Sequence, residues 1–173
     1  MTRAQRDRHG PGSSPRSYAV SVVTAAGSER ATLENLMQLY LHDFSEFDSS
    51  DVDEAGRYRY RYLPLYWSEP GRWPFLVRAD GNIAGFALVR HADGRYQMAE
   101  FFVLRRYRRR GVGEEAARQV FARFPGPWLV EELAANTTAI KFWRSVIGRF
   151  AGGFDEVQGP GGPQQLFESP MAV

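Results

Sequence analysis

The stretch FFVLRRYRRRGVG, residues 101–113, decides the fold, because apolar residues give way there to arginines and then to two glycines. An apolar, β-rich run followed by a turn and a helical pattern predicts a strand, a loop and a helix in that order. Gly111 and Gly113 leave room for backbone N–H groups to approach an anion at the start of the helix. The stretch therefore predicts a pyrophosphate cradle or, on spacing alone, a tight turn beside a solvated basic loop.

Two other phosphate-binding motifs do not fit this stretch. A P-loop needs Gly-Lys followed by Ser or Thr, and that sequence is absent. A dinucleotide fingerprint needs a third glycine and a strand–helix–strand order from the start of the domain. The sequence has neither, so it argues against a phosphate-binding P-loop and against a dinucleotide fingerprint.

Upstream of this stretch, the sequence predicts a helix and four strands. Apolar residues over 33–47 recur at helical spacing, and Ser28 is placed to cap that helix. The Asp-Gly-Asn of 80–82 is typical of a tight hairpin turn. We expect the aromatic-rich segment 48–71 to be a short helix or irregular, and to face the substrate. The predicted strands cover residues 18–24, 75–79, 83–90 and 96–104.

Downstream of the glycines, the pattern predicts a helix, a strand, a second helix and two final strands. The first helix covers 112–121, and the strand after it covers 128–133. Asn136 opens the second helix, and we expect Gly148 to end it as a left-handed cap. The final strands are predicted over residues 150–157 and 164–167.

Length and composition fit a single soluble domain. The chain has 173 residues, so we expect one domain over 18–173, preceded by a disordered basic tail over 1–17. No apolar run approaches the ~18 residues that span a bilayer, so we expect no membrane partner and a cytoplasmic location. The sequence has no cysteine and its three histidines are scattered, so we expect no metal site.

Two motifs together resemble those of the GNAT N-acetyltransferase superfamily. Arg108-x-x-Gly111-x-Gly113 is similar to that family's Q/R-x-x-G-x-G/A signature, and Asn136-x-x-Ala139-x-x-Phe142-Trp143 is similar to its N-x-x-A-x-x-F-Y segment. The resemblance extends over residues 75–167. It implies an α/β (α+β) fold with a mixed, mostly antiparallel sheet of about six to seven strands. That sheet would be splayed between its fourth and fifth strands and flanked by about four helices.

The resemblance also implies acetyl-CoA as the cofactor, held between the splayed strands. The strand before the basic loop would pair with the pantetheine arm like an added strand, and the N–H near Val103 would hold the oxyanion. The loop would take the pyrophosphate, while Asn136 would contact the cofactor, cap its own helix, or do both. The residues implied at the cofactor are Phe101, Phe102, Val103, Arg108, Arg109, Arg110, Gly111, Val112, Gly113, Asn136, Phe142 and Trp143.

Attack by an amine needs a base, and the resemblance points to two carboxylates. Glu100 is the first candidate, because its segment EFFV is similar to the DFFV of spermidine/spermine acetyltransferases. Glu131 is the second, since bacterial ribosomal-protein alanine acetyltransferases place a catalytic Glu on the facing strand. Strand alternation separates Glu131 from Glu132, so at most one of them can line the gap. An ordinary exposed strand carboxylate is the alternative for both candidates.

Trp143 departs from the family pattern, which usually has a tyrosine there to protonate the leaving thiolate. An indole N–H donates a hydrogen bond but is not an acid near neutral pH. Tyr60, Tyr62 and Tyr107 are alternative donors. The thiol of coenzyme A has a pKa near ~8.5, taking cysteine as the guide, so departure as the thiolate is also tolerable.

Three functions remain open from the sequence. The first is an N-acetyltransferase that moves the acetyl group of acetyl-CoA onto a primary amine of a small molecule or peptide, by direct attack in a ternary complex. The second is a non-catalytic acyl-CoA-binding or sensor module, which the substitution at Trp143 leaves open. The third, nucleic-acid binding through the arginines of 105–110 and the Arg/Tyr run of 57–62, is the least favoured. The sequence leaves a homodimer open.

Overall fold

The computed structural model describes residues 17–171, so the predicted tail lies almost entirely outside the described residues. Its centre is a seven-stranded sheet with the order β1-β2-β3-β4-β5-β7-β6. Neighbouring strands are antiparallel except β4 and β5, which are parallel. This mixed sheet confirms the predicted fold class. The strands are β1 (Val20–Thr24), β2 (Arg72–Ala79), β3 (Asn82–Ala92), β4 (Arg95–Val103), β5 (Gly126–Glu131), β6 (Asp155–Gln158) and β7 (Pro163–Ser169).

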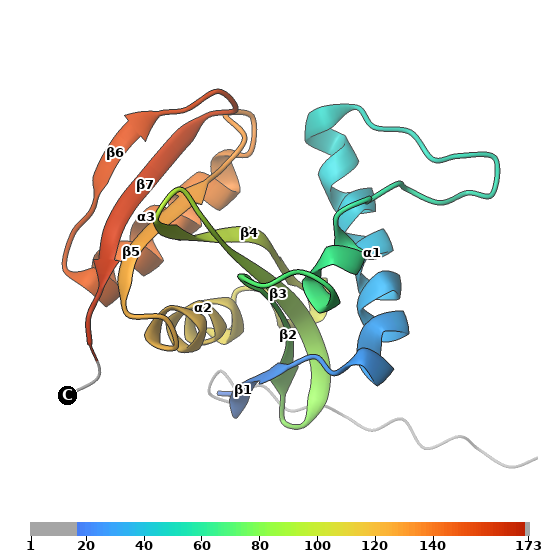
Figure 1. The fold of residues 1–173 in the computed structure, drawn as a ribbon, viewed down its shortest axis with the longest axis horizontal. Coiled ribbons are helices and arrows are strands. Elements are labelled where there is room, and N and C mark those ends of the chain that lie inside the picture. Colours follow the sequence, from blue (N-terminus) through green and yellow to red (C-terminus); the bar gives the residue numbers. More distant parts are fainter. Residues whose placement is uncertain (1–16, 172–173) are drawn as a thin grey trace, which may run out of the picture.

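Helices cover both faces of this sheet (Figure 1). Helix α1 and the 3-10 helix η2 pack on one face, while α2 and α3 pack on the other. The helices of residues 17–171 are α1 (Arg30–Asp48), α2 (Val112–Ala122) and α3 (Thr137–Ala151), with 3-10 helices η1 (Gly27–Glu29), η2 (Leu63–Trp67) and η3 (Arg105–Tyr107). The described chain thus has three α-helices rather than the expected four, because the segment 48–71 contributes only η2.

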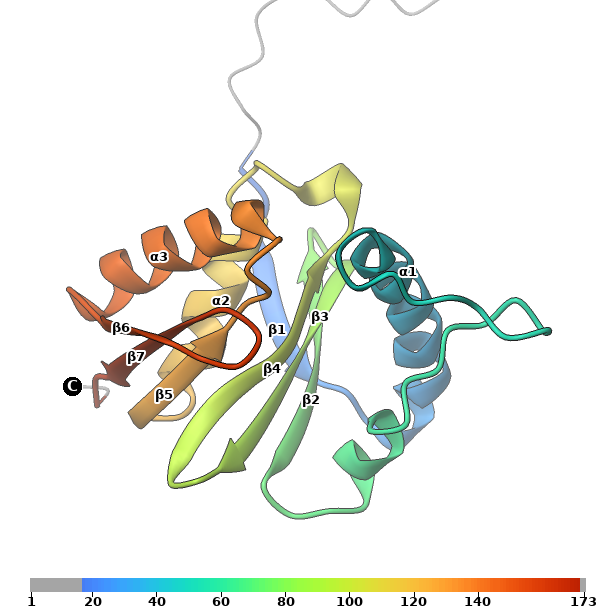
Figure 2. The ribbon, with the colours of Figure 1, turned by 90° about the horizontal axis from the view of Figure 1, so that it is seen from above.

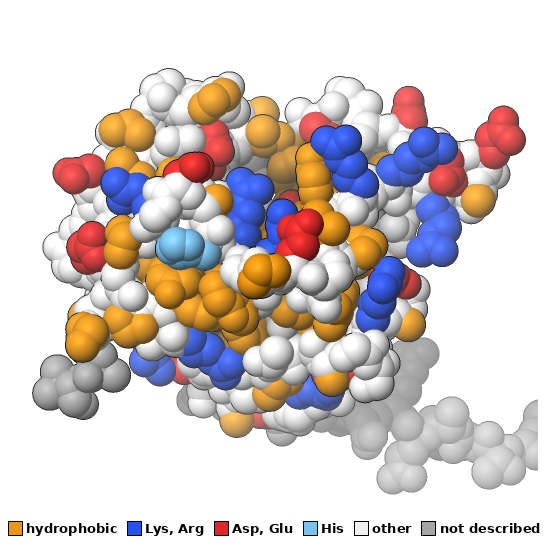
Figure 3. Space-filling view, viewed as in Figure 1, with side chains coloured by type: hydrophobic (Ala, Val, Ile, Leu, Met, Phe, Trp, Pro, Cys, Tyr) orange, Lys and Arg blue, Asp and Glu red, His pale blue; other side chains and the backbone are white. Residues whose placement is uncertain are grey.

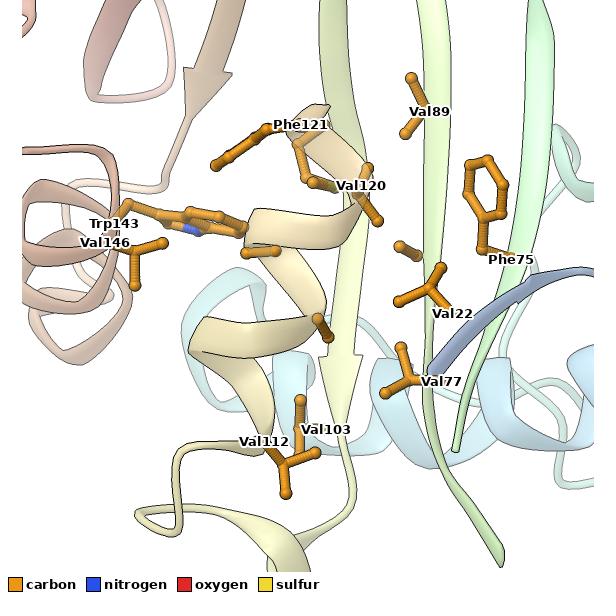
Figure 4. Packing of buried hydrophobic residues seen from close by; sticks show 14 of the residues in the cluster. Val22, Phe75, Val77, Val89, Val103, Val112, Val120, Phe121, Trp143 and Val146 are labelled. Atoms are coloured by element: carbon orange, nitrogen blue, oxygen red, sulfur yellow. The ribbon is translucent and has the colours of Figure 1, made fainter. Parts of the chain in front are cut away.

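Side chains of the strands alternate between these two layers, as expected for a sheet buried on both faces. In β2, Phe75 belongs to the cluster under α2 and α3, whereas its neighbour Leu76 belongs to the cluster under α1. Figure 4 shows the cluster that contains Phe75, with Val120 and Phe121 of α2 and Trp143 of α3 in it. Full burial of a Val, Leu or Phe side chain stabilises the folded state by about 1.5–3 kcal/mol. A register slip would exchange the two clusters, so burial on both faces fixes the pairing.

β4 and β5 pair at one end only. In the described chain they are joined at residues 96–97 of β4 and 128–129 of β5, and nowhere beyond. On its other edge, β4 follows β3 along its length, but Ala99 is skipped in the register. Such a bulge bends its strand, and Figure 2 shows β4 turning away from β5. This confirms the predicted splay and leaves one backbone edge of residues 98–103 without a neighbouring strand.

The end of α3 differs from the prediction. Gly148 lies inside the helix, which continues to Ala151, and Gly152 is the left-handed cap with a φ of 76°. The Gly152 N–H donates to the Gly148 carbonyl at 3.1 Å. Phe150 packs 5.4 Å from the ring of Phe121, so the core favours helix beyond Gly148. The predicted strand over 150–157 was therefore wrong in its first five residues, since β6 begins at Asp155.

Other element boundaries also differ. Ser28 lies inside η1 and does not cap α1, whose N-cap residue is Glu29 and which no side chain caps. At η1, Glu29 Oε2 accepts the Ala26 N–H at 3.1 Å. β5 begins and ends two residues before its predicted bounds, which leaves Glu132 just past its end. Within residues 17–171, no helix has the length and apolar character needed to span a membrane.

Candidate functional site

A cavity of about 680 Å³ opens beside the unpaired end of β4. α1 forms one wall, the starts of α2 and α3 form the opposite wall, and the basic loop after β4 lies at one end. In Figure 3 the surface between the α1 side and the β5–β7 side is hollowed, with hydrophobic side chains inside the hollow. The residues implied at the cofactor all line this cavity, except Arg110 and Val112. The tertiary structure thus brings the two sequence motifs to one place.

The start of α2 leaves backbone donors without a side-chain partner. Gly111 adopts the left-handed conformation with a φ of 77°, and no side chain caps the helix. A Cβ at Gly111 would meet no atom within 4 Å, so the backbone conformation, not lack of space, requires glycine there. At Gly113 a Cβ would lie 3.3 Å from the Phe142 ring and 3.6 Å from Val103 Cγ2. An uncapped helix start with close packing behind it can accept an anion.

Asp43 of α1 organises the basic loop. Its carboxylate accepts hydrogen bonds from Arg105 at 2.6 Å and from Arg108 at 2.5 Å. Arg108 Nε also donates to the Val103 carbonyl at 2.7 Å. Partial burial works to raise the pKa of Asp43, but the two guanidinium groups outweigh it and hold that pKa below its usual range. Arg108 therefore fixes the end of β4, and Asp43 neutralises part of its charge.

Two further arginines of the loop, Arg109 and Arg110, differ in what they contact. Arg110 donates to the Tyr18 hydroxyl at 3.2 Å and lies outside the cavity wall. Arg109 is exposed, lines the cavity and forms no ion pair within residues 17–171. Its φ of 58° is left-handed, which costs a non-glycine residue roughly 1–2 kcal/mol. Of these two arginines, only Arg109 offers its full charge to the cavity.

The start of α3 closes the wall beside the glycines. Asn136 Oδ1 accepts the Ala139 N–H at 3.0 Å, so Asn136 caps α3 as the sequence suggested, and the residue also lines the cavity. Trp143 is buried against Phe101 and Phe142, with ring centroids 5.0 Å and 4.9 Å away. Its indole also lines the cavity. The alternative proton donors Tyr60, Tyr62 and Tyr107 do not.

Glu100 lies behind the cavity wall. Its Oε2 accepts the Tyr40 hydroxyl at 2.5 Å, and its Oε1 accepts the Tyr60 hydroxyl at 2.8 Å. Burial raises the pKa of Glu100, and the two phenol hydrogen bonds oppose this only in part. Glu100 itself is not part of the cavity wall, whereas Tyr40 is.

The two glutamates at the end of β5 also lie outside the cavity wall. Glu131 is exposed, and its Oε1 accepts the Gly161 N–H at 3.4 Å. Glu132 is buried, with 5% of its surface exposed, and accepts a hydrogen bond from Gln165 at 3.1 Å. Burial raises the pKa of Glu132 to about 7. Over residues 17–171, no group of three or more His, Asp or Glu side chains is placed to hold a metal ion.

Sequence reasoning missed Tyr40 and Asp43, which the cavity wall includes. Helical spacing placed Tyr40 on the same face of α1 as Phe44 and Phe47, and that face was interpreted as core. The pattern contains no sign that the last turns of α1 extend past the sheet and border an opening. The partners of Tyr40 and Asp43 lie about 60 residues away, so local spacing could not have found them.

Comparisons with known proteins agree with this geometry. Residues 33–148 match the family model described as the acetyltransferase (GNAT) family. A comparison with curated proteins found no match.

Solved structures share the fold at low sequence identity. An acetyltransferase from Thermus thermophilus has a TM-score of 0.65 and 14% identity, covering 88% of this chain and 97% of that chain. Salmonella typhimurium yncA, with its cofactor acetyl-CoA, has a TM-score of 0.59 and 14% identity, covering 89% and 95%. Spermidine N-acetyltransferase from Vibrio cholerae, in complex with CoA and spermine, has a TM-score of 0.60 and 9% identity, covering 85% and 92%. With the family match over residues 33–148, these similarities lead to one conclusion: this chain belongs to the GNAT family of acetyltransferases.

Proposed function

We propose that this protein is an N-acetyltransferase that moves the acetyl group of acetyl-CoA onto a primary amine of a small molecule or peptide. The two substrates would be bound together, and the amine would attack directly. One observation carries the proposal: the free edge of β4 and the uncapped start of α2 meet in a single cavity. The free strand edge can pair with an extended chain that contains amides, and the free N–H groups at the helix start can bind a phosphate. Pantetheine joined to pyrophosphate has both features.

The residues at the cavity fit this cofactor. Backbone groups of residues 101–103 would pair with the pantetheine amides, and the Val103 N–H would face the thioester oxygen. The first-turn N–H groups of α2, with Arg109, would hold the pyrophosphate, while Asn136 Nδ2 has no partner in residues 17–171 and would serve the cofactor. Bound acetyl-CoA would supply the activated acetyl group. Arg108 would act mainly by holding the Val103 carbonyl and with it the end of β4.

Glu100 is the better of the two candidate bases. It is on the strand that borders the cavity, and one of its hydrogen-bond partners lines that cavity. Glu131 is exposed and turned to the Gly161 N–H, outside the cavity wall. The raised pKa makes Glu100 a stronger base than an ordinary carboxylate. Trp143 would pack against the cofactor, and its indole N–H would donate a hydrogen bond without releasing a proton.

Calorimetry with coenzyme A tests the phosphate end of the proposal. Gly111→Asp would place a carboxylate at the start of α2, where it competes with an anion for the free N–H groups. Asp tolerates the left-handed conformation, so the variant should fold and lose coenzyme A affinity by at least about tenfold. Gly111→Asn is the matched control, because it adds the same bulk without the charge and should lose less. Equal affinities for wild type and Gly111→Asp would contradict the assignment.

A thiol-release assay tests catalysis. Acetyl-CoA would be offered with polyamines, amino acids, aminoglycosides and peptides with free N-termini. Release of the free thiol in the presence of an amine, above the rate of hydrolysis, is the expected result. The second candidate function is the non-catalytic acyl-CoA module, and Trp143 favours it because no tyrosine occupies that place in the wall. Coenzyme A binding without thiol release for any amine would select that alternative.

A further inference from the structure

Tyr40 stands between the cavity and the carboxylate of Glu100. It lines the cavity from α1, and its hydroxyl donates to Glu100 Oε2 at 2.5 Å. Tyr60 donates to the other carboxylate oxygen at 2.8 Å but is not part of the cavity wall. Both oxygens of Glu100 therefore accept a hydrogen bond from a phenol, and of these two tyrosines only Tyr40 lines the cavity. A substrate amine in the cavity would meet Tyr40 before it met Glu100.

We propose that Tyr40 relays a proton from the acceptor amine to Glu100. This inference rests on the proposed function. In the step, an N–H bond of the ammonium breaks and its electron pair stays on nitrogen. The proton binds Tyr40 Oη while the proton already on Oη moves to Glu100 Oε2. Tyr40 ends neutral, Glu100 ends as the carboxylic acid, and the amine is left with a free lone pair.

The hydroxyl of Tyr40 has the chemistry that a relay needs. A phenol carries one proton and keeps lone pairs, so it can accept from the amine while it donates to Glu100. The 2.5 Å separation is at the short end for an O–H donor to a carboxylate, which favours transfer along that bond. Burial and the negative charge of Glu100 raise the pKa of the Tyr40 hydroxyl. The resting group is therefore a neutral phenol rather than a phenolate.

The groups around Glu100 set the pH at which the relay can work. They are Tyr40 from α1, Tyr60, Tyr66 from η2 and Arg90 from β3. Burial raises the pKa of Glu100, while the two hydrogen-bonding phenols and the charge of Arg90 oppose this rise. The carboxylate form must be present to receive a proton, so turnover should fall as pH drops through this raised pKa.

Tyr40→Phe and Tyr60→Phe are a matched pair for the test, since each removes one phenol from the same carboxylate. We expect Tyr40→Phe to lower kcat by about 100-fold or more, which is the range of a lost proton-transfer group. Its coenzyme A affinity by calorimetry should stay within about twofold, because the variant keeps the ring and removes only a hydroxyl that is hydrogen-bonded to Glu100. In mixtures of light and heavy water, the dependence of the wild-type kcat on the deuterium fraction should be that expected when two protons move in one step. That response should be lost in Tyr40→Phe.

Tyr60→Phe should behave differently. It should keep the two-proton response and lose less than about tenfold in kcat. Its pH profile should shift to higher pH, because one hydrogen bond that lowers the Glu100 pKa is gone. Carbon-13 NMR of Glu100 in the protein without cofactor gives a readout apart from activity. Both variants should titrate Glu100 at higher pH than the wild type does.

The double variant Tyr40→Phe/Glu100→Gln should be no slower than the worse single variant, since both remove the same relay. The proposal is overturned by a kcat of Tyr40→Phe within about threefold of wild type, by equal losses in the two phenol variants, or by additive losses in the double variant. An unchanged Glu100 titration in Tyr40→Phe overturns it without any activity measurement. A wild type that binds coenzyme A but releases no thiol overturns the proposed function and the relay with it.

Discussion

Replacing Glu132 by glutamine should stabilise the protein above neutral pH. Gln165 Nε2 donates to Glu132 Oε2 at 3.1 Å, and 5% of Glu132 is exposed. Glu132 Oε1 and Gln165 Oε1 are both buried acceptors without a hydrogen-bond partner in residues 17–171. A proton on Glu132 would supply a donor to this pair. The side-chain amide of a glutamine would supply that donor at every pH.

The magnitude follows from the pKa of Glu132. Burial raises this pKa to about 7, the Gln165 hydrogen bond opposes the rise, and the charge of Glu156 adds to it. The ordinary value is 4.5, and a difference of about 2.5 corresponds to ~3 kcal/mol at 1.36 kcal/mol per pH unit. Between these two pKa values, Glu132 is ionised in the unfolded chain but still protonated in the folded protein. The free energy of unfolding therefore falls as pH rises. The stability that the folded protein gains by holding this proton is fully present below about pH 4.5 and is lost above about pH 7.

Urea unfolding of wild type and Glu132→Gln between about pH 5 and pH 8 measures this difference. The variant should gain up to about 3 kcal/mol over wild type at the upper end, and much less at the lower end. Titrating groups that do not interact with Glu132 cancel in the difference between the two proteins. Glu131→Gln is the matched control, because its carboxylate is exposed and should change stability by less than about 0.5 kcal/mol. A variant less stable than wild type at the upper end, or a difference independent of pH, would refute the reasoning.

Three further predictions concern stability. Asp43→Asn should cost about 1 kcal/mol in urea unfolding, because two partly exposed ion pairs are lost. The cost should vanish as pH falls through the lowered pKa of Asp43; a cost that persists in acid would contradict this. Gly148→Ala should stabilise by up to about 1 kcal/mol and Gly152→Ala should destabilise by a similar amount, so thermal unfolding tests where α3 ends. Gly113→Val should lower the free energy of unfolding by roughly 1–3 kcal/mol, because the new side chain would press on Phe142. An unchanged free energy of unfolding would show that the cavity wall can move to accommodate the valine.

The sequence by itself predicted the order of the elements and the chemistry of the cofactor end of the site. These rest on local patterns. Alternating strands, helical spacing and a glycine junction all involve residues within a few positions of one another. The motifs around Gly111 and Asn136 were therefore readable, and the structure brings both to one cavity. The end of α3 was misjudged because the packing of Phe150 on Phe121 is a tertiary contact that outweighs the helix-breaking tendency of Gly148.

Several pairs of side chains that are distant in sequence were decided only by the tertiary structure. Tyr40 meets Glu100 across 60 positions, and Asp43 meets Arg108 across 65. Glu132 meets Gln165 across 33 positions. Nothing in local spacing encodes such pairs, because they depend on how α1 and the separated strands pack after the sheet forms. Burial then sets the pKa values of Glu100 and Glu132, and burial is a property of the packed chain, not of the segment that carries the residue.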